Sequence, residues 1–268
     1  MGQKFLSEAS AKASEAPKIY GGEIGGWPML KIQYLTDPEG IAKLLPPGIE
    51  PGAEPKVFVT FYNVPIDNAP EYGTVVSVAA KFNGIEGEYT ILFAISQEEP
   101  VILCQELWGQ PKYPGQTTYF RFGDTVEAKC THQGYTFIEF KGQIKGQFDI
   151  PEFEEHNWWV KKMRGGDYMN PTAWSYPPHV MKIYAKYGTE YAEKVEGTLK
   201  LRESPWDPMS EILPVRSSVN AYLWTPQFLD RSISVAGPLD PDKFLPYADT
   251  ISGSRWLGQN GGPKKHGG

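Results

Sequence analysis

Apolar and β-branched residues recur along the chain in short runs that are separated by Gly, Pro and Asn. Such runs, bounded by turn residues, are typical of strands in antiparallel sheets. They predict strands at 56–64, 74–82, 89–96, 100–107, 119–122, 125–131, 135–144, 195–203 and 218–225. The pattern therefore predicts an α+β, mainly β protein in which helices lie at the periphery of the sheet.

Helical patterns are fewer. The sequence Thr36-Asp37-Pro38-Glu39 has the spacing of a capping box, with Pro early in the first turn, and predicts a helix that ends at Pro46. Apolar and aromatic residues at near-helical spacing predict a second helix over about 179–195. Shorter helical turns are expected at 226–231 and 240–248.

The chain divides into three parts by composition. Residues 1–17 are polar and rich in Ala and Ser, and we expect them to form a mobile leader. Residues 18–258 contain no repeat and no low-complexity linker, which predicts a single domain. Residues 259–268 are expected to form a flexible tail.

Charge and hydropathy exclude several classes of protein. The net charge of -6 argues against a nucleic-acid surface, which needs clustered Lys and Arg. The sequence has neither the roughly 18 to 20 consecutive apolar residues of a membrane helix nor a signal peptide, so we expect no membrane partner and a cytoplasmic location. Cys104 and Cys130 are expected to be free thiols.

Common catalytic motifs do not match. The four His residues are far apart in sequence, so we expect no metal site. No G-x-S-x-G motif occurs, and the glycine cluster at 21–26 does not follow a strand, which argues against a serine hydrolase and against dinucleotide binding.

The segment 82–115 holds the most distinctive residue, Lys112, which lies between two prolines and beside Trp108 and Tyr113. One interpretation is an ordinary loop lysine whose stem packs on aromatic rings while its ammonium stays in water. The other is a buried lysine whose charged form is disfavoured, so that a neutral amine attacks a carbonyl. Composition alone favours the first.

The order of short motifs in this segment resembles the acetoacetate decarboxylase superfamily. The chain reads Phe-Asn-Gly at 82–84, Gly-Glu-Tyr at 87–89, Glu-Pro at 99–100, Gln-Glu-Leu at 105–107 and Pro-Lys at 111–112. The family reads Phe-Asn-Gly, Gly-Asp-Tyr, Glu-Pro, Arg-Glu-Leu and Tyr-Pro-Lys-Lys in the same order. The resemblance covers about residues 20–140.

This resemblance implies an antiparallel β barrel or cone with peripheral helices, and an enzyme in which Lys112 forms a Schiff base with a ketone. It also implies an oligomer. The chain departs from the family at Tyr113, which replaces the second lysine, and at Trp27, which takes the place of a pocket arginine. The first pocket glutamate of the family falls near 59–61 and the second near 71–73.

Other residues of the segment have two interpretations each. Glu71 and Tyr72, expected on a loop before a strand, supply a general acid or base or are merely solvated. Glu106 is catalytic or fixes the lysine loop by hydrogen bonds. Arg121 replaces the missing pocket arginine or forms a surface ion pair, and Tyr119 competes with it as a donor. The expected catalytic residues are Lys112, Glu106 and Glu71, and the expected substrate-binding residues are Trp27, Tyr72, Trp108, Gln110, Tyr113 and Arg121.

The resemblance thus implies a lyase that makes or breaks a C–C bond, or eliminates water, through an iminium on Lys112. The lost cations favour the aldolase-dehydratase branch or a larger aromatic carbonyl substrate over decarboxylation of a β-keto acid, which stays as an alternative. The third hypothesis is a pocket that binds an aromatic metabolite without a covalent bond. Burial of Lys112 without an acid partner would favour the covalent hypotheses. An exposed or salt-bridged ammonium would favour the non-covalent pocket. Iminium chemistry needs no metal or cofactor.

Overall fold

The computed structural model describes residues 28–66, 69–165, 169, 172–248 and 256. The expected leader, the expected tail and Trp27 lie outside them. The elements in chain order are β1 (Met29–Leu35), α2 (Pro38–Leu44), β2 (Glu50–Pro51), β3 (Lys56–Ile66), β4 (Ala69–Phe82), β5 (Ile85–Ile95), α3 (Glu98–Trp108), β6 (Lys112–Pro114), β7 (Gln116–Phe122), β8 (Thr125–His132), β9 (Tyr135–Gln147), β10 (Phe153–Arg164), β11 (Trp174–Leu201), α4 (Met209–Ile212), β12 (Asn220–Pro238), α5 (Pro241–Phe244) and a 3₁₀ turn (Leu245–Tyr247).

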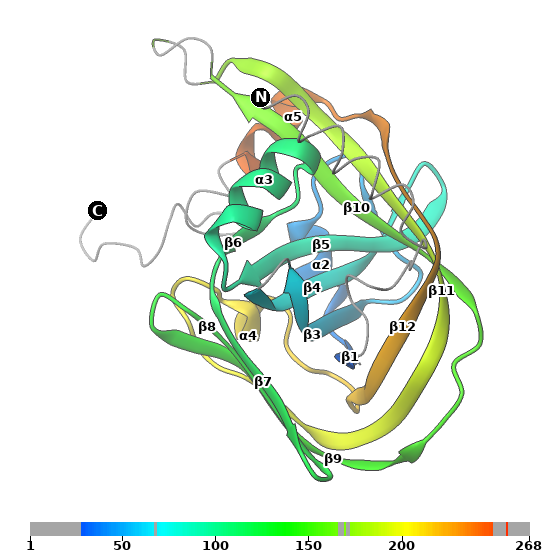
Figure 1. Ribbon diagram of the computed structural model, residues 1–268. Helices are drawn as coiled ribbons and strands as arrows, with labels where there is room; N and C mark the ends of the chain where they lie inside the picture. Colours follow the sequence, from blue (N-terminus) through cyan, green and yellow to red (C-terminus); the bar gives the residue numbers. More distant parts are fainter. Residues whose placement is uncertain (1–27, 67–68, 166–168, 170–171, 249–255, 257–268) are drawn as a thin grey trace, which may run out of the picture.

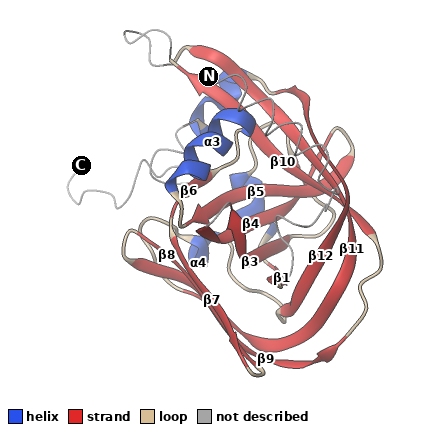
Figure 2. Ribbon diagram, viewed as in Figure 1, coloured by secondary structure: helices blue, strands red, loops and turns tan. Residues whose placement is uncertain are grey.

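A 12-stranded sheet dominates the structure, and its main path runs β10-β5-β4-β3-β1-β12-β11-β9-β8-β7 (Figures 1 and 2). Strand β10 pairs with β5 at one end of this path and also with β11, so the strands from β10 to β11 return on themselves as a ring. The 28-residue β11 continues beyond the ring and pairs with β9. The expected antiparallel barrel with peripheral helices is confirmed.

The two faces of the ring strands have different neighbours. On β1 the alternate residues Leu30, Ile32 and Tyr34 are buried in the main hydrophobic core. Strands β7 to β9 contribute to the same core, so this outer face of β1, β3, β4 and β5 packs against them. The other alternate positions, such as Lys31, point toward the inside of the ring. The fold thus separates an outer apolar face from an inner face that carries polar groups.

The Phe-Asn-Gly motif forms the turn of the β4–β5 hairpin. Asn83 and Gly84 both have positive φ, at 49° and 78°, which is the backbone of the tight turn that suits the right-handed twist of paired strands. The turn fixes the register of β4 against β5, and with it the residues that share the inner face.

Most expected elements are confirmed, including the helix after Thr36 and the helical turns at 240–248. Three expectations were wrong. Residues 100–107 lie in helix α3 and not in a strand. Exposed apolar residues on the solvent side of this helix made the run resemble a buried strand. Residues 179–195 lie in strand β11 and residues 226–231 in β12, where pairing with neighbouring strands overrides the local spacing.

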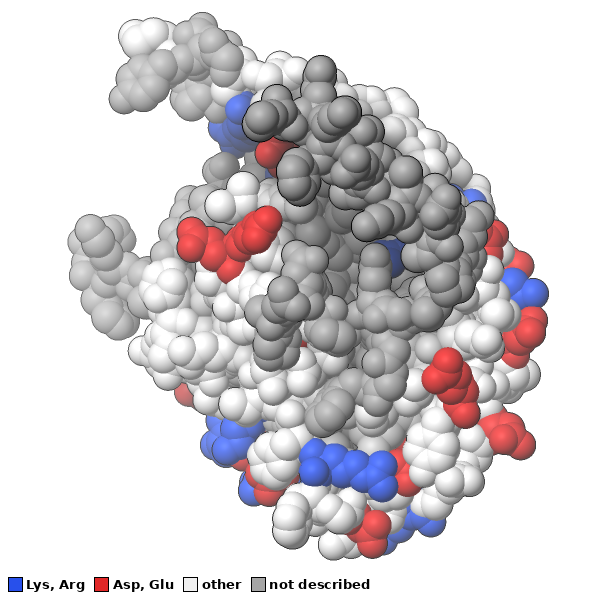
Figure 3. All heavy atoms as spheres, viewed as in Figure 1, with Lys and Arg blue, Asp and Glu red and all other residues white. Residues whose placement is uncertain are grey.

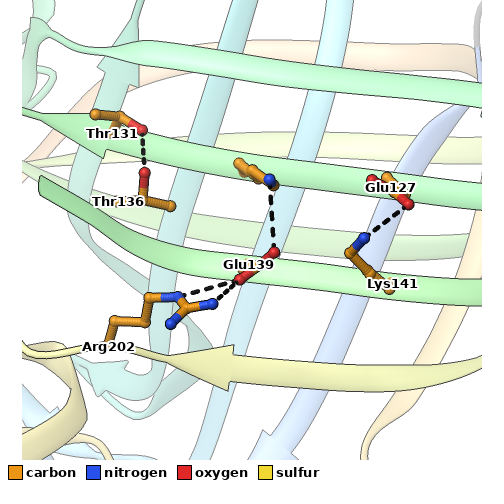
Figure 4. Close-up of polar contacts among 7 residues, drawn as sticks. Glu127, Thr131, Thr136, Glu139, Lys141 and Arg202 are labelled. Atoms are coloured by element: carbon orange, nitrogen blue, oxygen red, sulfur yellow. Dashed lines mark hydrogen bonds and ion pairs between the residues drawn. The ribbon is translucent and has the colours of Figure 1, made fainter.

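The outward side of the β8–β9 hairpin carries a row of polar pairs (Figure 4). Lys141 donates to Glu127 across the strands at 2.9 Å, and Arg202 binds Glu139. In Figure 3, acidic and basic side chains alternate around the rim of the visible face, without a large patch of one sign over its described residues. None of the helices in the described part of the chain is long and apolar enough to cross a membrane.

Candidate active site

Lys112 is fixed by the short strand β6, which runs parallel to β5 with Lys112 opposite Phe93. Its N–H donates to the carbonyl of Gln110 at 2.7 Å, and the side chain of Gln105 donates to its carbonyl oxygen. Both backbone groups of Lys112 are therefore held, one by the loop and one by helix α3. The residue is only 5% exposed, so the structure supports burial and not a solvated loop lysine.

A carboxylate and a phenol extend from the lysine along the inner face. Glu71 Oε2 lies 3.4 Å from Lys112 Nζ, and the Tyr62 hydroxyl donates to Glu71 Oε1 at 2.5 Å. All three side chains are buried. Burial, together with the adjacent Glu71 charge, raises the pKa of Tyr62 well above its ordinary value, so Tyr62 stays a protonated donor.

Gly73 makes the Tyr62–Glu71 contact geometrically possible. Tyr62 pairs with Gly73 across β3 and β4, and its ring crosses the place where a side chain would be. A Cβ on Gly73 would lie 2.1 Å from Tyr62 Cζ and 2.2 Å from its hydroxyl oxygen. Only glycine leaves room for this ring, because real Cβ contacts are never so short.

The surroundings of the lysine are otherwise apolar. Lys112 Nζ lies 5.1 Å from the centre of the Phe93 ring, and this ring packs edge-on against Tyr62 at 5.8 Å. The Cys104 thiol of helix α3 lies beside the ammonium. Burial raises the pKa of Cys104, and the Lys112 charge opposes that shift. The thiol is thus a neutral neighbour at ordinary pH.

This arrangement can activate an amine. A lysine attacks a carbonyl in its neutral form, and Glu71 is placed to accept the proton that the ammonium releases. The single carboxylate, buried and fixed by Tyr62, can return the same proton later. The candidate site is therefore Lys112, Glu71 and Tyr62 against Phe93.

The structure brings some of the sequence-predicted residues together and separates others. Glu71 and Tyr72 both lie in strand β4 and not on a loop, which corrects that expectation, and they alternate in direction. Tyr72 is half-buried. Trp108, at the end of α3, packs on the Trp159 cluster of the inner face. Gln110 is buried next to Lys112 in sequence and accepts its N–H through the carbonyl.

Glu106 lies on α3 and is exposed, so it does not join the buried Lys112–Glu71 pair. Tyr113 faces the outer side of the sheet, where its hydroxyl donates to Asp207 at 3.2 Å. His132 contacts the same carboxylate at 2.7 Å. Behind the lysine strand there is thus a buried polar network that belongs to the core.

Arg121 lies on β7, which packs on the outer face of β4, where Thr74 and Thr117 share a hydrogen bond of 2.7 Å. Its guanidinium donates to Glu193 at 2.5 Å, the ion-pair alternative that the sequence left open. Tyr119 donates to the carbonyl of Pro28 at 2.6 Å. Neither side chain reaches the inner face.

The inner face also carries a second polar cluster, which we name the Lys31 cluster: Lys31, Glu88 and Glu155. Burial acts to lower the pKa of Lys31, but the charges of Glu155 and Glu88 outweigh it and the pKa is raised. Burial and the Glu155 charge raise the pKa of Glu88 to about 8, against the opposing Lys31 charge. Lys31 Nζ lies 5.7 Å from the centre of the Trp224 ring.

Sequence reasoning missed Tyr62, Phe93, Cys104 and the Lys31 cluster. Glu88 lay within a recognised motif, and the alternation of β3 and β4 was visible in the sequence. Their register was not, and register decides which side chains meet. Among the described residues, no three His, Cys, Asp or Glu side chains gather to hold a metal ion.

Comparison with curated proteins finds acetoacetate decarboxylases. Acetoacetate decarboxylase 1 of Bradyrhizobium diazoefficiens is 39% identical over 85 residues, which cover 30% of this chain and 33% of that protein. The acetoacetate decarboxylase of Chromobacterium violaceum is 35% identical over 99 residues, covering 35% and 39%. These matches span only about a third of the relatives' own lengths.

Solved structures share the fold at low identity. A structure of acetoacetate decarboxylase superposes with a TM-score of 0.66 at 19% identity, over 79% of this chain and 87% of that chain. An acetoacetate decarboxylase-like enzyme from Sphingomonas wittichii gives 0.61 at 15% identity, over 80% and 92%. The enduracididine biosynthesis enzyme MppR, solved with the condensation product of pyruvate and imidazole 4-carboxaldehyde, gives 0.59 at 13% identity, over 77% and 87%.

The family model matches much more of the sequence than these two curated relatives do. The model described as acetoacetate decarboxylase (ADC) covers residues 7–236, which include the lysine strand, the glutamate strand and most of the ring. The chain belongs to the acetoacetate decarboxylase family.

Proposed function

We propose that the protein is a lyase in which Lys112 forms a Schiff base with a small carbonyl substrate. The observation that carries this proposal is the buried Lys112–Glu71–Tyr62 chain on the inner face of the ring. Desolvation favours the neutral amine that such chemistry uses, and the adjacent carboxylate can accept the proton that the ammonium gives up.

Glu71 accepts the proton of the Lys112 ammonium, and the neutral Nζ attacks the carbonyl carbon. A proton of the attacking nitrogen moves to the carbonyl oxygen and makes it a hydroxyl. Glu71 then returns its own proton to this hydroxyl, so that water leaves and an iminium forms. The positive nitrogen accepts the electron pair of a breaking C–C or C–H bond. The Tyr62 hydroxyl, 2.5 Å from Glu71, stabilises the carboxylate each time it is charged.

The Lys112–Glu71 contact also supports a second candidate, a pocket that binds its ligand without a covalent bond, since the ammonium has an acid partner. The distance of 3.4 Å is long for a charge-assisted hydrogen bond, which is usually about 2.7–2.9 Å. The shorter bond of Glu71 is made to Tyr62. This asymmetry favours a lysine that can give up its proton over one that is locked as a cation.

Within the proposed lyase class, decarboxylation and aldol or dehydration chemistry remain separate candidates. The curated relatives are acetoacetate decarboxylases. This chain has Tyr113 in place of the family's second lysine, and Tyr113 faces the core. Loss of that cation favours the aldolase-dehydratase candidate, because a β-keto acid anion has lost one of the cations that would hold its carboxylate.

The test is reductive trapping. The protein is incubated with pyruvate, acetoacetate or an aromatic aldehyde in the presence of borohydride, and adducts are located by peptide mass spectrometry. We expect a stable adduct on Lys112 that disappears in Lys112→Ala. Lys141→Ala is the matched control, since Lys141 also pairs with a glutamate but is 58% exposed. Absence of any adduct in folded protein would leave the non-covalent candidate.

A further inference from the structure

Strand β12 carries an arginine, Arg231, on the inner face of the ring. Arg231 pairs with Ala185, and Ile233 pairs with Ile183 two residues along in the same unbroken register. Ile233 packs with the inner-face cluster of Trp159 and Ile183. Because residues two apart on a strand share a face, Arg231 points to the same side as Ile233.

The Arg231 charge acts on two titratable side chains, Cys104 and Tyr187. It opposes the burial that raises the pKa of Cys104, the thiol beside Lys112. It also opposes the rise in the pKa of Tyr187, which burial and Glu155 cause next to the Lys31 cluster. Arg231 therefore lies within electrostatic reach of the thiol beside Lys112 and of Tyr187, which lies next to the Lys31 cluster.

Two other cations of this face lie near carboxylates. Lys112 forms an ion pair with Glu71, and the charges of Glu155 and Glu88 raise the pKa of Lys31. Arg231 is exposed, and its backbone N–H donates to Asp230 at 2.8 Å. Within the described part of the chain no Asp or Glu forms an ion pair with its guanidinium, which lies 5.7 Å from the centre of the Phe228 ring. A guanidinium in this state has its full fork of donors ready for a planar anion.

We propose that Arg231 binds the carboxylate of the substrate whose carbonyl reacts with Lys112, so that the site takes oxo acids and keeps their carboxylate bound through the reaction. The proposal rests on the proposed Schiff-base function. Arg231 would then provide the pocket cation that this chain lacks at the family's arginine position, where the resemblance places Trp27.

Arg231 also decides which bond breaks. A carboxylate held by a guanidinium is stabilised while charged, whereas decarboxylation removes that charge, so tight binding would oppose CO₂ loss. The C–H bond next to the iminium carbon breaks instead. Its proton passes to Glu71, its electron pair forms the enamine double bond, and the former iminium π pair returns to nitrogen. The enamine carbon can then attack a second carbonyl.

The test compares acids with their neutral esters. Pyruvate, acetoacetate and 4-oxopentanoate, and the methyl ester of each, are trapped by borohydride on the full chain, and the half-saturating concentration is measured. We expect Arg231→Gln to raise this concentration about tenfold to hundredfold for at least one acid, the loss typical of a hydrogen bond to a charged group, with its ester unchanged. Arg231→Lys should retain part of the preference.

Arg202→Gln is the control, since the Arg202 guanidinium binds Glu139 on the outward side of the β8–β9 hairpin, away from the inner face of the ring (Figure 4). If all acids and esters are trapped equally by wild type and Arg231→Gln, or if both decline together, the carboxylate role of Arg231 is wrong while the Schiff base stands. If wild type traps nothing, the proposed function itself fails, and this outcome is distinct.

Discussion

Replacing Gly73 by alanine tests the geometry that joins Tyr62 to Glu71. The new Cβ would lie 2.1 Å from Tyr62 Cζ, so the ring must move by about 1.5 Å to reach ordinary van der Waals contact. The ring cannot swing freely, because it is buried and packed edge-on against Phe93. A displacement of this size breaks the 2.5 Å hydrogen bond to Glu71.

The cost of Gly73→Ala is the sum of two effects. Overpacking a buried site costs about 1–3 kcal/mol, and losing a hydrogen bond to a charged group costs about 1.5–3 kcal/mol. We expect Gly73→Ala to lower the free energy of unfolding by about 2.5–6 kcal/mol, and Tyr62→Phe, which loses only the hydrogen bond, by about 1.5–3 kcal/mol. The measurement is urea unfolding at pH 7.

The double variant separates this explanation from a general loss of packing. If Gly73→Ala already breaks the Tyr62–Glu71 bond, adding Tyr62→Phe costs nothing more, and the double variant is no less stable than Gly73→Ala alone. Full additivity of the two single effects would refute the reasoning. Gly237→Ala is the matched control, since a Cβ there meets its nearest atom at an ordinary 3.5 Å.

Three further predictions concern buried titratable groups. Asp207→Ala leaves the His132 ring without its 2.7 Å partner and should destabilise the protein by about 3–5 kcal/mol in urea unfolding; a change below ~1 kcal/mol would contradict this. Glu88 has a folded pKa of about 8 against an ordinary 4.5, so between these values the folded state binds more protons and the free energy of unfolding falls as pH rises. Glu88→Gln should flatten that decline when urea unfolding is measured from pH 5 to 8, and an unchanged slope would count against this explanation. Burial raises the pKa of Cys104 while Lys112 opposes it, so Lys112→Met should slow alkylation of Cys104 by iodoacetamide; a faster reaction would be inconsistent with that charge effect.

Local signals in the sequence were sufficient for most of the strands and for Lys112. Alternation and turn residues are short-range, and the Phe-Asn-Gly turn forms as its residue types require. Helix α3 could also have been identified from its ends: Glu98 and Glu99 lie in its first turn, and Gly109 ends it in the left-handed conformation. Its exposed apolar residues hid the helical period.

Long-range pairing explains what the sequence could not predict. The residues of β11 repeat at near-helical spacing, yet β10 and β12 on either side hold the segment extended. The partners of Lys112 come from β3, β4 and β5, and only the register of these strands places Tyr62 and Phe93 near it. Arg231 is over a hundred residues away in the chain and carries no motif. Candidate nucleophiles are visible in sequence, whereas their environment is a property of the closed sheet.

Adjacent residues of β6 serve opposite sides of the sheet: Lys112 the inner face, Tyr113 the core. This alternation limits the insertions and deletions that the family can accept near the lysine. One residue inserted just before Lys112 would shift β6 by one position against β5. The two side chains would then exchange faces, so that the amine of Lys112 would lie in the core and the phenol of Tyr113 inside the ring. Two added residues would restore the alternation. We therefore expect length variation in related chains to occur in the loops, while the spacing from Phe93 to Lys112 changes only together with a bulge.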